Sequence, residues 1–272
     1  MSNSADPVPV RAFEVDRLRV RVYADRPSMG LAAARHLARA LREAGGAAGG
    51  AGTGTGGAGI GMVFASAPSQ VEVLAALTRE SDVPWPAVTA FHLDEYVGLD
   101  DTHPRSFARF LREHVVEKVP LAAVHYLSTQ GADLEEAAQR YGERLRRVGL
   151  AVGCIGVGEN GHIAFNEPND TDFRDPRQVR VIELDLRSRQ QQVNEGLFAS
   201  VDEVPTHALT LTVPAILAAR TLACVVPGEN KAAAVARMLA GPIAPDSPAS
   251  ALRAHPSATL FLDREAAALL PA

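Results

Sequence analysis

The sequence predicts a single α/β domain in which a mostly parallel sheet carries helices on both faces. Short apolar or β-branched segments alternate with longer amphipathic segments along all 272 residues, which is typical of parallel strands joined by helices. Hydrophobic residues make up 47% of the chain, enough for one sizeable core. No repeat of fixed period and no linker marks a boundary, so we expect one domain over residues 1–272.

Each expected strand is a short apolar run, and each expected helix is a longer segment with one apolar side. The strands are expected at 18–24, 60–66, 87–93, 150–158, 179–184, 208–213, 221–226 and 258–262. The helices are expected at 28–44, 69–80, 105–118, 133–148, 229–240 and 263–270. Residues 45–59, "GGAAGGAGTGTGGAG", are too small to pack well, so we expect a flexible surface loop there.

Charge and composition limit the classes of partner. The formal net charge is -5, with 27 basic and 32 acidic residues mixed along the chain, which indicates no surface for nucleic acid or an anionic membrane. Cys154 and Cys224 lie in apolar strand-like runs and are expected to be buried thiols, neither a disulfide nor a metal pair. No signal pattern and no run of roughly 18 apolar residues is present. We therefore expect a cytoplasmic protein whose partners are small molecules.

Polar residues follow several expected strands, where ligands gather in parallel α/β sheets. In "FHLDEYVGLDDTHPRSF", residues 91–107, an apolar strand leads directly into Asp94 and Glu95. These carboxylates either belong to a site or are solvated acids at a strand end, with Asp101 or Thr102 capping the next helix. Considered alone, the second interpretation is the more common one.

A second strand end breaks into glycines in "IGVGENGHIAFNEP", residues 155–168. Gly156 and Gly158 allow the chain to leave the sheet tightly. Asn160 and His162 then lie in a turn, and Glu167 follows a short apolar segment that should anchor the loop. The alternative is an ordinary Asn-Gly turn with an incidental histidine.

Two further strand ends carry groups that suit an anion. In "FASAPSQ" a helix begins near Pro68, so Ser66, Ser69 and free backbone N–H groups could face a phosphate, although ordinary capping explains the serines equally well. No P-loop motif is present. In "VVPGENKAAAV", Lys231 lies in the first turn of a helix, where a cation opposes the helix dipole unless an anion binds. Four such strand ends together favour a site more than any one of them does.

Taken together, "FHLDEYVGLDDTHPRSF", "GVGENGHIAFNEP", "PGENKA" and "AHPSATLFLD" resemble the glucosamine-6-phosphate deaminase/isomerase family, in order and spacing over roughly residues 18–265. The resemblance implies a modified Rossmann-like α/β fold and a place in amino-sugar metabolism. It implies the conversion of glucosamine 6-phosphate and water to fructose 6-phosphate and ammonia. It also implies that no metal or organic cofactor is needed.

The resemblance assigns roles to residues. Asp94 would move a proton from C2 to C1 of the opened sugar, which requires a carboxylate that is unprotonated near pH 7. His162 would open the pyranose ring, with Glu167 orienting or charge-balancing it. Asn160 completes the predicted catalytic group, and Glu95 is a candidate supporting residue. The implied substrate and phosphate contacts are Ser66, Ala67, Ser69, Gly161 and Lys231.

Three features depart from better-known family members. Asn160 stands where many have aspartate; it can hydrogen-bond the histidine but cannot stabilise an imidazolium by charge, which predicts a different pH optimum. "SAPSQ" replaces "TGGTP" or "TGSTP" in the phosphate loop, with the loss of two conformationally permissive positions. The phosphate-binding arginine of those members aligns near Glu195, which leaves Arg187 or Arg189 as candidates to replace it.

Three functions fit these residues. The first is an enzyme, hydrolase or isomerase, that isomerises and deaminates a 2-amino-2-deoxyhexose 6-phosphate. The second is a hydrolase resembling 6-phosphogluconolactonase, whose reaction needs no C2 proton abstraction and therefore no Asp94. The third is a sugar-phosphate sensor, which has little use for a full set of catalytic side chains. The choice between glucosamine and galactosamine and the oligomeric state, with a homo-oligomer as one option, stay open.

Overall fold

The structure is a computed structural model that describes residues 6–50, 59–131, 133–168, 170–194 and 196–271. The strands of its main sheet are β1 (Arg11–Val15), β2 (Leu18–Val22), β3 (Ile60–Phe64), β4 (Val88–His92), β6 (Ala123–His125), β7 (Leu150–Ile155), β10 (Thr221–Val226) and β11 (Ala258–Leu262). They lie in the order β1-β2-β11-β10-β7-β3-β4-β6. All neighbouring pairs except β1 and β2 are parallel, which confirms the expected sheet.

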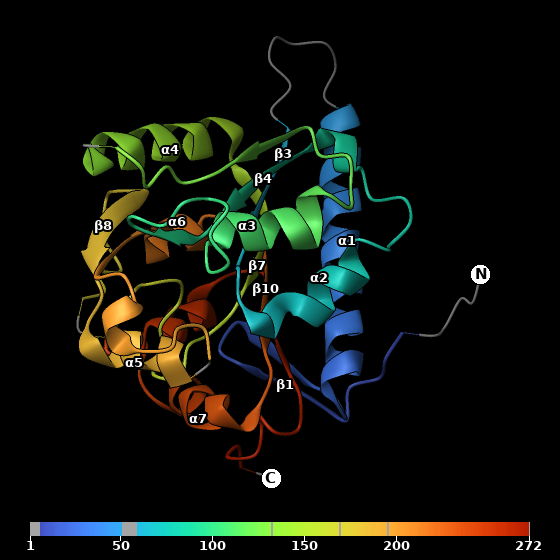
Figure 1. The fold of residues 1–272 in the computed structure, drawn as a ribbon. Coiled ribbons are helices and arrows are strands. Elements are labelled where there is room, and N and C mark those ends of the chain that lie inside the picture. The colour runs from blue at the N-terminus through green and yellow to red at the C-terminus, as the bar shows by residue number, and fades with distance from the viewer. Residues whose placement is uncertain (1–5, 51–58, 132, 169, 195, 272) are drawn as a thin grey trace.

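Helices cover both faces of the main sheet, as parallel strands require. They are α1 (Arg26–Gly50), α2 (Val71–Leu77), α3 (Phe107–Leu111), α4 (Leu134–Val148), α5 (Leu186–Asn194), α6 (Val213–Leu217) and α7 (Ala232–Ala240). Figure 1 shows α1 to the right of the sheet and α4 and α6 to its left. Leu37 of α1 and Leu74 of α2 share one hydrophobic core with the sheet, whereas Tyr141 of α4 and Met238 of α7 belong to another core. The expected two-faced arrangement is therefore confirmed.

A second, smaller sheet is antiparallel and consists of β5 (Asp94–Tyr96), β9 (His207–Leu211) and β8 (Val179–Glu183), in that order. The expected strands at 179–184 and 208–213 thus exist, but they lie outside the main sheet. Its core is aromatic, with the rings of Tyr96 and Phe165 5.3 Å apart at their centroids. Because β5 begins just after β4 ends, the chain passes from the parallel sheet to the small sheet at Asp94.

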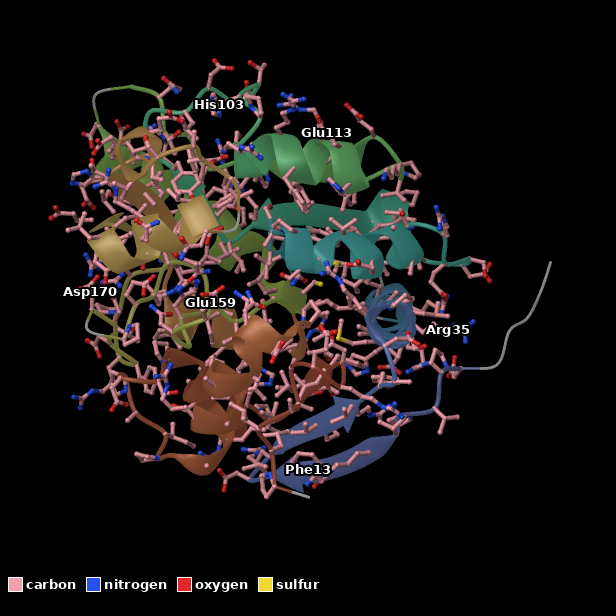
Figure 2. The ribbon with its side chains drawn as sticks, turned by 60° about the horizontal axis from the view of Figure 1, so that its bottom comes forward. Phe13, Arg35, His103, Glu113, Glu159 and Asp170 are labelled. Atoms are coloured by element: carbon pink, nitrogen blue, oxygen red, sulfur yellow. The ribbon has the colours of Figure 1, made fainter. Side chains whose placement is uncertain are left out.

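The β1–β2 hairpin forms one edge of the main sheet. Figure 2 shows Phe13 of β1 at this edge and His103 and Glu113, which follow β5 in the chain, at the opposite side of the molecule. The Arg11 guanidinium lies 4.5 Å from the centre of the Phe13 ring. We did not expect β1, because "RAFEV" alternates polar and apolar residues without the continuous apolar run used to recognise the other strands.

Two expected segments differ from the structure. Residues 45–50, expected in a flexible loop, are the last turns of α1, and Gly45 there lies close to Pro84; the rest of that segment, 51–58, is outside the described residues. Residues 263–270, expected as a helix, form turns. The Asp263 carboxylate accepts hydrogen bonds from the N–H groups of Gly228 and Ala266, which ties this segment to the end of β10. Tertiary contacts therefore override the local pattern at both places.

Candidate active site at the carboxyl edge of the sheet

A cavity of about 270 Å³ lies where the strands of the main sheet end. This volume is close to the lower end of the range for small-molecule sites, about 300 to 1,000 Å³. Its walls come from the segments that follow β3, β4, β7 and β10, which are the four strand ends predicted from the sequence. The predicted site residues that line it are Ser66, Ala67, Ser69, Asp94, His162 and Lys231. Asn160, Gly161, Glu167 and Glu95 do not line it.

Asp94 opens β5 and is 8% exposed. Burial, with a smaller contribution from the charge of Glu95, raises the pKa of Asp94 to about 8. From the sequence we expected an unprotonated carboxylate near pH 7, and the structure differs, because its surroundings favour the acid form at that pH. A cation placed beside the carboxyl group would lower the pKa again and prepare Asp94 to act as a base.

The raised pKa of Asp94 predicts that Asp94→Asn stabilises the fold near pH 8, although the same substitution is expected to lower activity. The unfolded-state pKa of an aspartate is about 3.9, so the stabilisation that the folded protein gains from the Asp94 proton is complete below pH 4 and is lost as the pH rises to about 8. Asparagine has no such dependence. We expect the melting temperature of Asp94→Asn, relative to the wild type, to increase between pH 5 and pH 8, as measured by calorimetry. A difference that is constant with pH contradicts this account.

Glu95, the residue after Asp94, is held by hydrogen bonds to the start of α3. Its carboxylate, 2% exposed, accepts hydrogen bonds from the side chain or backbone of residues at the start of α3, namely Ser106 Oγ (2.8 Å), Phe107 N (3.1 Å) and Ala108 N (2.8 Å). Burial raises the pKa of Glu95, and these hydrogen bonds oppose the rise. Glu95 therefore ties β5 to α3, next to the point where Asp94 lines the cavity.

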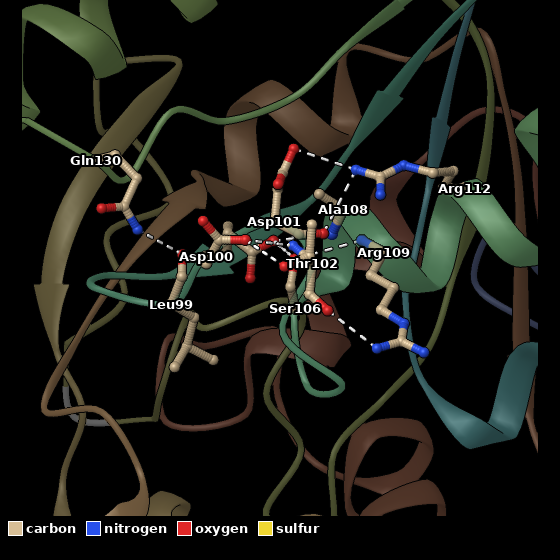
Figure 3. A network of polar contacts seen from close by, with 10 residues as sticks. Leu99, Asp100, Asp101, Thr102, Ser106, Ala108, Arg109, Arg112 and Gln130 are labelled. Atoms are coloured by element: carbon tan, nitrogen blue, oxygen red, sulfur yellow. Dashed lines mark hydrogen bonds and ion pairs between the residues drawn. The ribbon is translucent and has the colours of Figure 1, made fainter.

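The loop between β5 and α3 is held by polar contacts of its own, which Figure 3 shows. Arg112 Nη2 lies 3.2 Å from Asp101 Oδ2, and Arg109 Nη1 donates to the carbonyl oxygen of Thr102 at 2.9 Å. The alternative that Asp101 or Thr102 caps the next helix is wrong, because Ser106 is the N-cap of α3 and its hydroxyl accepts from Arg109 N. These contacts fix the loop without using the Asp94 carboxyl group, which lines the cavity.

His162, Glu167 and Asn160 form one network. His162 Nδ1 lies 3.1 Å from Glu167 Oε1, and Asn160 Nδ2 donates to Glu167 Oε2 at 2.5 Å. Burial alone would raise the pKa of Glu167, but the His162 charge and the hydrogen bonds outweigh it and lower the pKa to about 2. Glu167 is therefore ionised at neutral pH and holds the Nδ1 side of the ring. This contact leaves Nε2 as the nitrogen not held by a carboxylate.

Asn160 contacts the backbone of His162 instead of its ring. Its Oδ1 accepts a hydrogen bond from His162 N at 3.0 Å, and Arg237 Nη2 donates to the Asn160 carbonyl oxygen. The negative charge beside the imidazole thus comes from Glu167. Asn160 positions the loop and the Glu167 carboxylate without lining the cavity.

Two glycines shape the loop that presents His162. A Cβ on Gly158 would lie 2.2 Å from the ring atoms Cε1 and Nε2 of His162, so the imidazole rests directly on the backbone. Gly161 has a φ of 94°, in the left-handed region that favours glycine. The loop then folds back, and Gly158 N donates to the His162 carbonyl oxygen at 3.0 Å. A larger residue at 158 would displace the imidazole from its place against the backbone.

The strand β9 contacts both the segment of Asp94 and the loop of His162. Thr210 pairs with Asp94 across the small sheet, and Thr210 Oγ1 accepts a hydrogen bond from Phe165 N at 3.1 Å. Asn166 Nδ2 also donates to the carbonyl oxygen of Leu211 at 2.8 Å. Because one strand contacts both segments, it sets the spacing between Asp94 and the loop of His162.

The predicted phosphate loop lies after β3. Ser66 is 6% exposed, lines the cavity, and its Oγ has no hydrogen-bond partner among the described residues. Gln70 Nε2 donates to Ser69 Oγ at 3.0 Å and to the carbonyl oxygen of Val225 at 3.2 Å. The loop is therefore braced by the buried Gln70 side chain, and Ser66 keeps a buried hydroxyl available for a ligand.

Lys231 reaches the cavity from the segment between β10 and α7. It is 8% exposed, and its backbone N donates to the carbonyl oxygen of Gly228 at 3.1 Å. The link from Gln70 to Val225 places the loop of Ser66 beside the end of β10, and Lys231 follows that strand. Ser66 and Lys231, two of the expected phosphate contacts, therefore come from adjacent segments of the cavity lining.

Several lining residues were missed from the sequence. Gln191 and Gln192 of α5 line the cavity, and the Tyr96 hydroxyl donates to Gln192 Oε1 at 2.8 Å. Arg26, the first residue of α1, lines it too. Consecutive amides in one helical segment, and a cation in the first turn of a helix, were the signals that could have identified these residues.

Arg187 and Arg189 were the candidates to replace the phosphate-binding arginine that aligns near Glu195, and the structure describes the side chain of Arg189 but not that of Arg187. Arg189 uses its guanidinium on the backbone, donating to the carbonyl oxygens of Val201 (2.5 Å) and Val204 (3.2 Å). It does not line the cavity. The side chain of Arg187 and all of Glu195 lie outside the described part of the chain.

Neither a metal site nor a membrane span is found in the described part of the chain. No group of three or more His, Cys, Asp or Glu side chains there could hold a metal ion. Cys154 and Cys224 are buried free thiols, as expected. No helix among the described residues is long and apolar enough to cross a membrane.

Comparison with known proteins gives a consistent result. The family model described as glucosamine-6-phosphate isomerases/6-phosphogluconolactonase matches residues 28–261. The chain is 37% identical over 180 residues to a glucosamine-6-phosphate deaminase of an Exiguobacterium species, which covers 66% of this chain and 69% of the relative. It is 34% identical over 215 residues to a glucosamine-6-phosphate deaminase of Halothermothrix orenii, covering 78% of this chain and 87% of the relative.

Solved structures show the same fold. A monomeric glucosamine-6-phosphate deaminase matches with a TM-score of 0.81 and 28% identity, covering 92% of this chain and 99% of that chain. A 6-phosphogluconolactonase from Trypanosoma brucei matches with a TM-score of 0.70 and 19% identity, covering 96% of this chain and 100% of that chain. The second match supports the fold alone. The sequence identity to the deaminases is therefore more informative about this chain than the structural match to the lactonase.

Proposed function

Because the chain belongs to the family of glucosamine-6-phosphate isomerases and 6-phosphogluconolactonases, we propose that it converts glucosamine 6-phosphate and water to fructose 6-phosphate and ammonia. One observation carries this choice within the family. A buried Asp94 carboxyl group with a raised pKa and a His162 imidazole backed by Glu167 line one cavity. A base and a ring-opening group are the two things that the reaction requires.

Ring opening is assigned to His162. Its imidazole moves a proton between the anomeric hydroxyl and the ring oxygen, so that the C1–O5 bond breaks and the open-chain aldehyde forms. Glu167 stabilises the imidazolium form by charge at 3.1 Å from Nδ1. Asn160 and Gly158 fix the ring orientation, the first through the backbone N–H of His162 and the second by direct packing.

Isomerisation is assigned to Asp94. The protonated amino group at C2 of the sugar is a cation, and beside Asp94 it would lower the raised pKa of the carboxyl group. The carboxylate then takes the proton from C2 while a proton passes from the ammonium group to the C1 oxygen, so that an enolamine forms between C1 and C2. The same carboxyl group then returns its proton to C1. Water adds to the resulting iminium carbon at C2 and ammonia leaves, which gives the ketose.

The phosphate is assigned to the wall formed by Ser66, Ala67, Ser69 and Lys231. The Ser66 hydroxyl, unpaired among the described residues, and the Lys231 ammonium supply a donor and a charge. Gly161 does not line the cavity and contributes through the shape of the loop. Residues 1–272 as one domain and a cytoplasmic location stay predictions, and the oligomeric state, with a homo-oligomer as one option, stays open.

The test is an assay of ammonia release coupled to the detection of fructose 6-phosphate. The purified chain should release both products from glucosamine 6-phosphate in equal amounts, and unphosphorylated glucosamine should react far more slowly. Hydrolysis of 6-phosphogluconolactone is measured at the same enzyme concentration, and galactosamine 6-phosphate is included to determine epimer preference. Lactone hydrolysis without ammonia release would replace the proposal with the lactonase function. Tight sugar-phosphate binding without turnover of either substrate would indicate a sensor.

A further inference from the structure

Arg26 lies at a position where its charge costs helix stability. It is the first residue of α1, and no acidic residue occupies the first turn of that helix. The Asp25 carboxylate accepts a hydrogen bond from Ser28 N at 2.7 Å, so the helix start is already capped. A cation in the first turn is unfavourable with respect to the helix dipole. The stability of α1 therefore does not explain an arginine at position 26, and the contacts of its side chain explain it better.

The side chain of Arg26 crosses to the phosphate loop. Its Nη2 donates to the carbonyl oxygen of Pro68 at 2.6 Å, and its Nε lies 2.7 Å from Glu72 Oε1. Nη1 makes no hydrogen bond with a residue that the structure describes. The Arg26 side chain is 39% exposed and lines the cavity, whereas Glu72 does not line it. Arg26 thus lines the cavity with one guanidinium nitrogen, Nη1, that no described residue engages, while its ion-pair partner Glu72 is not part of the lining.

Arg26 shares this wall with groups that suit an anion. Pro68, whose carbonyl it binds, lies between Ser66 and Ser69, and Ser66 Oγ is a buried hydroxyl without a partner in the described part of the chain. Among the charged side chains that line the cavity, Arg26 and Lys231 are cations and Asp94 is the acid. A second permanent cation next to the serines is suited to a phosphate dianion, which a single lysine neutralises only in part.

We propose that Arg26 binds the phosphate of the substrate and, in this chain, takes the role of the arginine missing near Glu195. The inference rests on the proposed function for the identity of the sugar phosphate, but the binding of phosphate itself does not. The arginine comes from the first turn of α1 instead of the α5 region, and the "SAPSQ" loop accommodates it because the Pro68 carbonyl accepts its Nη2. Arg26 is a binding residue and takes no part in proton transfer.

The test compares Arg26→Gln, Arg26→Lys and Glu72→Gln with the wild type. We expect Arg26→Gln to raise KM for glucosamine 6-phosphate by about 10- to 100-fold, the range for a lost charged hydrogen bond. The kcat should change by less than about threefold, because the substrate contact is the same in the ground and transition states. The inhibition constant of inorganic phosphate for Arg26→Gln should rise by a factor similar to the rise in KM. Arg26→Lys, which keeps the charge, should recover most of the affinity.

Glu72→Gln is the matched control. It breaks the same ion pair but leaves Arg26 and its charge in place, so KM and phosphate inhibition should stay within about twofold of the wild type or improve. If Arg26 only clamps the loop through Glu72, this variant will reproduce the defect of Arg26→Gln, and the proposal is overturned. Circular dichroism melting of each variant identifies any loss of folding.

Calorimetric titration with inorganic phosphate separates this inference from the proposed function. A wild type that releases no ammonia but binds phosphate, with Arg26→Gln binding it at least tenfold more weakly, would refute the deaminase and retain the role of Arg26. A wild type that releases ammonia, with Arg26→Gln unchanged in KM and in phosphate binding, would retain the deaminase and refute the role of Arg26. Absence of phosphate binding by the wild type also refutes it.

Discussion

Asp94→Asn is expected to lower kcat for glucosamine 6-phosphate by at least about 10³-fold, within the usual range for a general base. The amide has the shape of the carboxyl group but cannot accept the C2 proton or return it to C1. The KM should change by only a few-fold, since the phosphate wall is not altered. Steady-state assays of ammonia release at pH 8, where the wild-type carboxyl group is close to its pKa of about 8, measure the effect.

Asp101→Asn is the control for this substitution. Asp101 lies in the loop after β5, its side chain is 63% exposed, and it pairs with Arg112 outside the cavity. Its activity should stay within about twofold of the wild type, because exposed ion pairs contribute little. An Asp94→Asn protein that keeps the wild-type turnover, or an Asp101→Asn protein that loses it, contradicts the role given to Asp94.

His162→Ala is expected to lower kcat/KM by about 10²- to 10⁴-fold, because the ring then opens without proton transfer by the protein. The substitution removes the imidazole that packs on Gly158 and leaves space there. Added imidazole should therefore restore part of the activity, in proportion to its concentration. Rescue of this kind distinguishes a chemical role from a loss of folding.

Glu167→Gln is the companion variant. Glutamine keeps the size of the side chain and can hydrogen-bond both Asn160 and His162, but it removes the charge that lies 3.1 Å from Nδ1. We expect a smaller loss of kcat/KM than in His162→Ala, because the substitution removes the charge beside Nδ1 but leaves the imidazole in place. A Glu167→Gln protein as inactive as His162→Ala would instead indicate that Glu167 is needed for folding of the loop.

Most of the site could be predicted because its residues follow strands. Asp94, His162, Ser66 and Lys231 lie at the carboxyl ends of strands that the sequence identifies, and a parallel sheet brings such ends to one edge. The pairing of His162 with Glu167 was also implied by the motif, and the distance of 3.1 Å agrees with it. Contacts between segments that are close in the sequence are the easiest to anticipate.

The parts that were missed depend on contacts between distant segments. Arg26 reaches Pro68, which is 42 residues away in the chain, and nothing near Arg26 in the sequence indicates that contact. Likewise, β5 pairs with β9, so the residues of "DEY" form a strand of a second sheet although they follow directly on β4. The raised pKa of Asp94 results from the burial of its side chain in the folded protein, which sequence alone does not show.

The most direct test follows glucosamine 6-phosphate labelled with deuterium at C2 by nuclear magnetic resonance, with wild-type and Asp94→Asn proteins in parallel. With the wild type, the label should leave C2 at the rate at which fructose 6-phosphate and ammonium form, and with Asp94→Asn it should stay at C2 with no product on the same timescale. Loss of the label at equal rates with both proteins, or retention with a wild type that hydrolyses 6-phosphogluconolactone, would contradict the central claim that Asp94 of this chain abstracts the C2 proton of an amino sugar phosphate.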